Sequence, residues 1–121
     1  PNLVINKHLD INREIIKWAE EKISNITQFG VKKEQLIFDP GIGFSKNADQ
    51  SVQILKNIDT YQALNLPIYI GHSMKSFLDI VNIEGSREQK TIKISQFLAK
   101  NKVDYLRVHN VYLHKQALGN Q

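Results

Sequence analysis

Three polar motifs in this sequence each follow a short apolar segment. The motifs occupy residues 39–44, 71–77 and 107–110, directly after the apolar segments 36–38, 68–70 and 105–106. Continuous apolar segments of this kind are typical of parallel strands that are buried on both faces. Polar residues that follow successive parallel strands form the active sites of α/β barrels and of open α/β sheets. The sequence therefore predicts one site, built at three strand ends.

The first two motifs carry groups that suit a flat ligand with polar edges. An ionised Asp39 only accepts hydrogen bonds, so it suits a ligand with adjacent N–H donors. Gly71 would allow a flat ring to lie close to its strand end, and Lys75 could donate to ring oxygen or nitrogen atoms. Phe44 could line the ligand pocket or simply cover the end of the sheet. The structural alternatives are that Asp39 caps the turn after it and that Lys75 is a surface lysine.

The third motif predicts an anion site. Arg107 and His109 lie two residues apart on a predicted strand, so their side chains share a face. Arginine offers phosphate a bidentate fork, and a suitably protonated histidine adds a donor. The alternative is that both make structural hydrogen bonds at a strand end. The remaining histidines, His8, His72 and His114, show no metal-binding spacing with carboxylates, so we assign them no chemistry and predict no metal ligand in the chain.

Composition limits the classes of protein to which the chain could belong. It has 121 residues, a net charge of +4 and no cysteine, which suits one small domain without disulfides or thiolate metal sites. No apolar run approaches the roughly 20 residues needed to cross a bilayer, and no signal-peptide pattern opens the chain. The lysines are scattered over predicted helices and form no basic cluster with aromatic residues. We therefore expect a cytoplasmic protein with no nucleic-acid or membrane partner.

The predicted elements alternate between strands and helices. Strands are expected at residues 3–5, 36–39, 68–71 and 105–109, with helices after Asp10, at about 48–63, 76–81 and 87–100, and at 112–118. Asp10 is expected to cap the first helix and Gly30 to end it. Its expected inward residues are Ile11, Ile15, Trp18, Ala19, Ile23 and Ile26; those of the helix at 87–100 are Ile94, Phe97 and Leu98. Because Pro1 leads directly into the first strand, we expect the chain to have been cut from a longer one.

This order gives four β/α units joined by connections long enough for parallel crossovers. Four such units are half of an eight-fold barrel, which needs roughly 250 residues. A half barrel leaves two strand edges open, so it should be marginal or aggregation-prone alone unless it pairs with another half.

The three motifs, in this order, resemble those of dihydropteroate synthase, the pterin-dependent transferase of folate biosynthesis. The family pattern is Asp-Pro-Gly-Ile/Phe-Gly-Phe, then Gly-x-Ser-Arg-Lys-Ser, then Arg-Val-His-Asp-Val. The first motif is intact, whereas the second has Met74 in place of the family's arginine and the third has Asn110 in place of aspartate. The resemblance covers most of residues 10–118. It implies that residues 1–121 form part of a pterin-binding TIM (β/α)8 barrel, its carboxyl-terminal half with strands five to eight.

The resemblance also implies a reaction, in which a dihydropterin methylene passes from its pyrophosphate ester to the amine of p-aminobenzoate. The implied pterin-binding residues are Asp39, Phe44, Gly71 and Lys75; Ser73 shapes the p-aminobenzoate pocket; Arg107 and His109 hold the pyrophosphate; and Lys75, Arg107 and His109 form the catalytic group. Because Met74 has neither charge nor donor, we expect weaker binding than in the family.

The resemblance implies further properties of a complete enzyme. These are Mg²⁺ as the cofactor, held by a residue outside this chain, a homodimeric assembly, and inhibition by sulfonamide mimics of p-aminobenzoate. A complete active site cannot be assembled from this chain alone, because two family motifs are missing from it. Two alternatives therefore stay open: a standalone half barrel that binds a pterin or an anion without catalysis, and a pterin-dependent methyltransferase.

Overall fold

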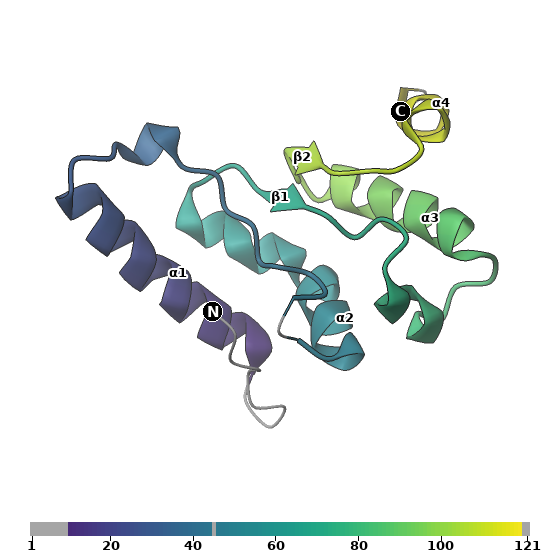
Figure 1. The fold of residues 1–121 in the computed structure, drawn as a ribbon, viewed down its shortest axis with the longest axis horizontal. Coiled ribbons are helices and arrows are strands. Elements are labelled where there is room, and N and C mark those ends of the chain that lie inside the picture. The colour runs from purple at the N-terminus through teal and green to yellow at the C-terminus, as the bar shows by residue number, and fades with distance from the viewer. Residues whose placement is uncertain (1–9, 45, 120–121) are drawn as a thin grey trace.

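The computed structural model describes residues 10–44 and 46–119. This part of the chain is mostly helical, with two short strands in its second half (Figure 1). In chain order the elements are α1 (Ile11–Gln28), the 3₁₀ helix η1 (Lys33–Gln35), α2 (Ala48–Lys56), the 3₁₀ helix η2 (Ile58–Leu64), β1 (Tyr69–Ile70), the 3₁₀ helix η3 (Ser76–Ile80), α3 (Arg87–Lys100), β2 (Tyr105–Leu106) and α4 (Val111–Gly119). No helix in the described ranges is both long and apolar enough to cross a membrane.

Three of the four predicted strand segments run parallel to one another. β1 pairs with β2, with Tyr69 opposite Tyr105, and an isolated parallel bridge joins Phe38 to Ile68. The strands are shorter than predicted, and the segment 36–39 forms only that bridge. On its other side this segment has no strand partner among the described residues. A segment that is paired on one side only has few inter-strand hydrogen bonds, so only a short part of it forms regular strand pairing. The strand predicted at residues 3–5 lies outside the described part of the chain.

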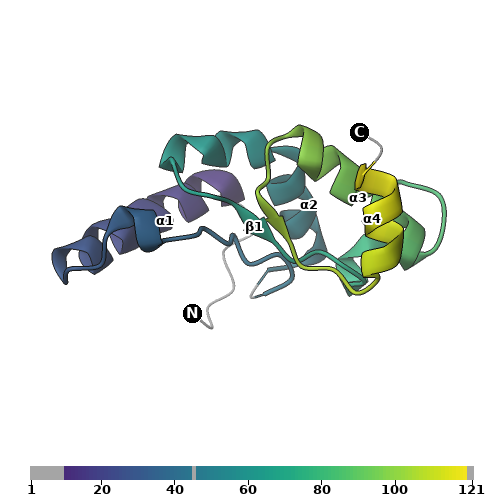
Figure 2. The same cartoon turned by 90° about the horizontal axis from the view of Figure 1, so that it is seen from above.

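The strand segments bury one face and leave the other exposed. Phe38, Ile68 and Ile70 are buried, whereas Ile37 and Tyr105 are 55% and 50% exposed. This alternation is the period of two expected when helices cover only one side of a sheet. In Figure 2 the paired segments around β1 run along one side of the molecule, with α1, α2 and α3 behind them. The polar strand ends therefore lie beside an uncovered surface.

The first helix has the predicted ends. Asp10 caps it by accepting hydrogen bonds from the backbone N–H groups of Asn12 and Arg13, at 3.1 and 3.4 Å. Gly30 follows the helix with a positive φ of 97°, a conformation that favours glycine. The predicted inward face is only partly correct, since Trp18 and Ile26 are exposed. The buried residues of α1 all lie between Ile11 and Ala19, in the helix that packs against α2 and η2; Ile26 lies beyond this stretch, whereas Trp18 lies within it but beside the buried face.

The helix predicted at 48–63 is divided into two. α2 ends at Lys56, because the next residue, Asn57, has a φ of −114° and a ψ of 28° that interrupt the α-helix, and the tighter η2 follows. Tyr61 is nevertheless buried, and its ring stacks on Phe38 with the centroids 5.3 Å apart. Its hydroxyl donates a 2.7 Å hydrogen bond to Asn12 Oδ1. Tyr61 therefore links the first strand segment to α1.

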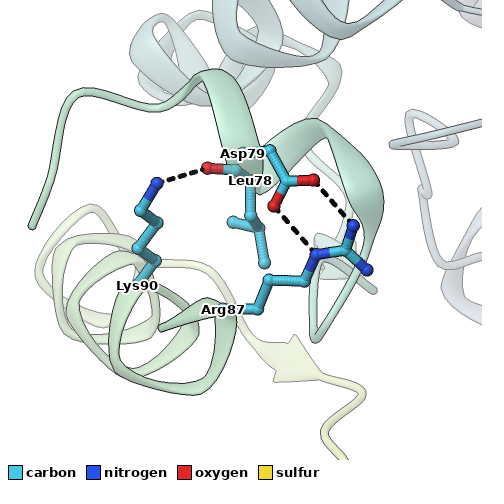
Figure 3. A network of polar contacts seen from close by, with 4 residues as sticks. All are labelled: Leu78, Asp79, Arg87 and Lys90. Carbon is cyan, nitrogen blue, oxygen red and sulfur yellow. Dashed lines mark hydrogen bonds and ion pairs between the residues drawn. The ribbon is translucent and has the colours of Figure 1, made fainter. Parts of the chain in front are cut away.

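The third helix, α3, spans the predicted residues and is tied to η3. Figure 3 shows Arg87 donating two hydrogen bonds to the carboxylate of Asp79, at 2.9 and 2.7 Å, and Lys90 donating to the Leu78 carbonyl at 2.9 Å. These contacts hold η3, which begins at the end of the second motif, against the first turn of α3. Phe97, predicted to point inward, is 42% exposed. No element among the described residues covers it on that side of the helix.

Candidate functional site

The first motif forms a tight loop whose shape depends on its own carboxylate. Asp39 Oδ1 accepts a 2.8 Å hydrogen bond from the backbone N–H of Gly41. Gly41 and Gly43 have φ values of 75° and 82°, a region that glycine adopts without strain. Asp39 is also exposed. The turn-capping interpretation of this residue is therefore correct, and the side chain still borders the uncovered side of the strand ends.

Lys75 joins the second motif to the first. Its Nζ donates a 2.7 Å hydrogen bond to the Ile42 carbonyl and lies 4.5 Å from the centroid of the Phe44 ring. That distance is within the range of a cation–π contact. A Cβ on Gly43 would lie 3.1 Å from Lys75 Cδ. Glycine at position 43 therefore makes room for the lysine.

The two lysines near the first motif have perturbed acidities. Burial lowers the pKa of Lys75, the nearby positive charge of Arg107 lowers it further, and Asp39 opposes both effects. Burial also lowers the pKa of Lys46, and Asp39 again opposes it. Lys46 is only partly exposed, and its Nζ donates a 3.0 Å hydrogen bond to the Phe44 carbonyl. Asp39 therefore lies in an electropositive environment.

Arg107 lies against Gly71 at the adjacent strand end. Its backbone N–H donates a 3.0 Å hydrogen bond to the Ile70 carbonyl, which extends the pairing of β1 with β2 by one residue. A Cβ on Gly71 would lie 3.0 Å from Arg107 Nη2 and 3.1 Å from Nε. Gly71 thus provides a flat backbone surface on which the guanidinium rests.

His109 contacts Ser73 two residues further along both segments. The Ser73 hydroxyl lies 2.8 Å from His109 Nδ1 and accepts a 3.2 Å hydrogen bond from the His109 backbone N–H. The exposed arginine and the exposed histidine are thereby fixed at neighbouring positions of the same parallel pair.

Met74, which departs from the family pattern, occupies an unusual backbone conformation. Its φ is 60°, which is uncommon for a residue other than glycine. Its backbone N–H donates to Thr91 Oγ1 at 3.1 Å, and Thr91 in turn donates to the Arg87 carbonyl at 2.7 Å. The Met74 side chain is 38% exposed. α3 therefore fixes the backbone here, and the side chain is free to be replaced.

A cavity of about 300 Å³ lies beside Phe44 and Lys75. It is lined by residues of the first two motifs, of α2 and of the segment between the first motif and α2, including Gly43, Phe44, Lys46, Lys75 and Phe77. The structure thus brings Phe44 to Lys75, Gly71 to Arg107 and Ser73 to His109. Within the described ranges, no group of three or more histidine or acidic residues could hold a metal ion.

Sequence reasoning missed a buried polar cluster behind the site. His72 and His114, to which we assigned no chemistry, both contact Ser95 of α3. Burial lowers the pKa of His72 to about 4, with further lowering from His114 and Lys75, while a hydrogen bond with the Thr91 backbone raises it. The signal that could have found the cluster is the inward face of α3, where Thr91 and Ser95 are polar residues at buried helical positions. His8 lies outside the described residues.

Comparisons with known proteins all lead to one family. The family model described as pterin binding enzyme matches residues 2–109. The folate synthesis bifunctional protein of Chlamydia muridarum is 34% identical over 122 residues, which cover 98% of this chain and 27% of that protein.

Solved structures give the same result. Dihydropteroate synthase from Anaplasma phagocytophilum, with bound 6-hydroxymethylpterin-monophosphate, matches with a TM-score of 0.83 and 37% identity over 91% of this chain and 42% of its own. The Xanthomonas albilineans dihydropteroate synthase with 4-aminobenzoic acid has a TM-score of 0.85 and 26% identity, over 95% of this chain and 43% of its own. The chain therefore spans less than half the length of each of these proteins.

Proposed function

Because this chain belongs to the pterin-binding enzyme family, we propose that it supplies part of the active site of a dihydropteroate synthase. In the proposed reaction the amine nitrogen of p-aminobenzoate attacks the methylene carbon of a dihydropterin pyrophosphate ester. The C–N bond forms, the C–O bond breaks, and its electron pair leaves with the pyrophosphate. The amine gives up one proton to solvent, and no covalent enzyme intermediate is needed.

The observation that carries this proposal is the paired arrangement of Arg107 on Gly71 and His109 on Ser73. Negative charge develops on the departing pyrophosphate, so prepositioned donors at that point lower the barrier. Arg107 would offer a bidentate fork to the phosphate oxygens, and His109 would donate from the ring nitrogen that does not face Ser73. These two residues are the proposed pyrophosphate site.

The first two motifs are the proposed pterin site. The second carboxylate oxygen of Asp39 would accept hydrogen bonds from the amino-pyrimidine edge, while Oδ1 keeps the loop closed. Lys75 would donate to the ring acceptors of the pterin, and Phe44 would cover one side of the pocket. Ser73 would shape the neighbouring p-aminobenzoate pocket. In this arrangement Lys75 holds the substrate close to the two pyrophosphate-binding residues.

We further propose that residues 1–121 form the carboxyl-terminal half of a TIM barrel, with strands five to eight, as one partial domain. The parallel segments and the single covered face support this proposal. In the complete enzyme, Mg²⁺ would be held by a residue outside this chain, as the family implies. A homodimeric assembly, a cytoplasmic location and sensitivity to sulfonamides belong to the same proposal and rest on the family alone.

The test of this function is a titration of the purified chain with dihydropterin pyrophosphate and, separately, with inorganic pyrophosphate. We expect both to bind the unmodified chain, and Arg107→Ala to lose most of the affinity for both. Arg13→Ala is the matched control, because Arg13 is an exposed arginine of α1, far from the motifs in sequence. Equal affinities for the Arg107→Ala variant and the unmodified chain would contradict the proposed pyrophosphate site. In a complete enzyme the same substitution should abolish turnover.

A further inference from the structure

One hydroxyl group in the interior contacts both histidines that flank the proposed site. Ser95 Oγ of α3 lies 2.9 Å from His72 Nε2 and 2.8 Å from His114 Nε2. Ser95 and His72 are fully buried and His114 is 6% exposed. His72 directly precedes Ser73, and His114 Nδ1 lies 2.9 Å from the backbone carbonyl of Asn110, the residue after His109. Ser95 Oγ therefore links the second motif to the third through these two histidines.

The direction of each hydrogen bond between His72, Ser95 and His114 follows from the carbonyl groups that the two histidines also contact. His72 Nε2 also lies 3.2 Å from the Thr91 carbonyl, which can only accept, so that nitrogen carries the proton. Beyond the other histidine, His114 Nδ1 must donate to the Asn110 carbonyl, so a ring with one proton has Nε2 as an acceptor. Ser95 therefore accepts from His72 and donates to His114. A residue without a hydroxyl could not do both.

The tautomer of His72 also determines the state of its other ring nitrogen, Nδ1. With the proton on Nε2, Nδ1 carries a lone pair, and this buried atom has no hydrogen-bond partner in the described part of the chain. An unmade hydrogen bond of this kind is costly. The arrangement is kept in spite of that cost, which indicates that the Nε2 contacts to Thr91 and Ser95 determine the position of the ring.

We infer that Ser95 is a positioning residue for the proposed site, setting the second motif against the third so that Ser73 meets His109. The role in substrate binding rests on the proposed function, whereas the contacts of Ser95 with the two histidines do not depend on it. Ser95 lies outside all three motifs and touches no group that we expect to contact substrate. It acts through His72 on the backbone of Ser73 and through His114 on the carbonyl beside His109.

The first test uses the unmodified chain and needs no substrate. Long-range ¹H–¹⁵N correlations of the imidazole rings report which ring nitrogen carries the proton. We expect protonation of His72 on Nε2 and of His114 on Nδ1. The opposite tautomer at either ring would overturn the inference, because Ser95 could not then connect the two histidines in the stated direction.

The second test compares Ser95→Ala with Ile94→Val, a mild change at the neighbouring buried position of the same helix. Ser95→Ala is expected to shift the imidazole signals of His109, because Ser73 and Asn110 are no longer held in place, whereas Ile94→Val leaves them unchanged. Coincident His109 signals in Ser95→Ala and the unmodified chain would overturn the inference. If Ser95→Ala does not fold, Ser95→Cys, which keeps a weaker donor, should shift the same signals by a smaller amount, and unshifted signals would again overturn it.

A pyrophosphate titration separates this inference from the proposed function. Ser95→Ala should weaken binding of inorganic pyrophosphate by roughly three- to tenfold, the range that one lost hydrogen bond supports. If the unmodified chain binds no pyrophosphate while Ser95→Ala still shifts the His109 signals, the proposed function fails and the positioning role stands. If both proteins bind pyrophosphate equally well, the positioning role fails and the proposed function stands.

Discussion

Lys75 Nζ lies 2.7 Å from the carbonyl oxygen of Ile42, and this hydrogen bond ties the second motif to the first. The ammonium group is held at the rim of the cavity, under the Phe44 ring and near the positive charge of Arg107. Its burial and this neighbouring charge both favour loss of its proton. We therefore expect anion binding at the proposed site to depend on pH.

The first prediction concerns that dependence. We expect the affinity for inorganic pyrophosphate to fall as the pH is raised toward 10.5, the ordinary pKa of lysine, because Lys75 loses its charge below that value. Lys75→Met should bind more weakly at pH 7 and show a flatter profile. The measurement is a calorimetric titration at several pH values, with Lys17→Met, a change at an exposed residue of α1, as the control. A profile that is equally steep in Lys75→Met would assign the titration to another group.

The same pKa shift has a consequence for stability. A lysine whose pKa is lowered in the folded state destabilises the fold while it is charged, and this penalty is relieved as the pH rises from the folded pKa to 10.5. Stability should therefore increase over that interval. Lys46, whose pKa is also lowered, contributes in the same direction. Lys75→Met should remove only one part of the increase, which chemical denaturation at pH 8 to 10.5 would detect.

The second prediction tests the contact of Arg107 with Gly71. Gly71→Ala places a Cβ 3.0 Å from the guanidinium, which is the end of a flexible side chain and can move away. The φ of Gly71 is not positive, so alanine fits the backbone and stability should change little. Displacement of Arg107 should weaken pyrophosphate binding by about tenfold, the equivalent of one charged hydrogen bond.

The control for this substitution is Gly119→Ala, since no atom lies within 4 Å of a Cβ at that position. It should leave pyrophosphate affinity unchanged. A Gly71→Ala variant that binds as well as the unmodified chain would mean that Arg107 does not need its position on Gly71 to hold an anion.

Much of the fold could be predicted because its signals are local. Asp10 and Gly30 mark the ends of α1 through hydrogen bonding and backbone conformation within a few residues, and α3 begins after Ser86, whose side chain accepts from the Gln89 backbone N–H. The exposure of Trp18 could not be predicted in this way. Trp18 lies between the buried Ile15 and Ala19 in sequence, so its exposure depends on how wide a face of α1 its neighbours cover, which no pattern within the helix records.

In the candidate site, too, the local features could be predicted and the long-range contacts could not. The three motifs, and the shared face of Arg107 and His109, follow from residue types and from the period of a strand. The contacts that fix the side chains do not, because Lys75 and Ile42 are 33 residues apart and His72 and Ser95 are 23 apart. A histidine in a loop after a strand gives no sign that it is fully buried.

The third prediction concerns Met74. Met74→Arg restores a cation with several donors beside the proposed pyrophosphate site, so it should strengthen binding of inorganic pyrophosphate by roughly tenfold, the scale of a charged hydrogen bond. The side chain is 38% exposed, so the longer arginine can be accommodated. The positive φ of 60° is equally unfavourable for both residues, so the backbone should not change.

Met74→Gln is the matched control, because it adds donors without adding charge. A gain in Met74→Arg that Met74→Gln lacks would assign the effect to charge. No gain in either variant would show that this position does not reach the anion.

The fourth prediction follows from the burial of His72, whose pKa is lowered from 6.5 to about 4. Between these values the unfolded chain binds a proton that the folded chain does not, so stability is lost as the pH falls through this window and levels off below it. The loss between pH 7 and pH 5 should be about 2 kcal/mol. In this interval most carboxylates remain ionised, so proton binding by His72 in the unfolded chain dominates the change in stability. Denaturation by urea at pH 7, 6 and 5 measures it.

His72→Gln provides the comparison. The amide of glutamine can still donate to the Thr91 carbonyl, but it does not titrate, so the free energy of unfolding should vary less between pH 7 and pH 5 than in the unmodified chain. The variant should be less stable at pH 7, because the contact with Ser95 is weakened. The two curves should therefore converge as the pH falls. Parallel curves of unfolding free energy against pH would show that the pH dependence comes from groups other than His72. They would also contradict a lowered pKa of this buried ring.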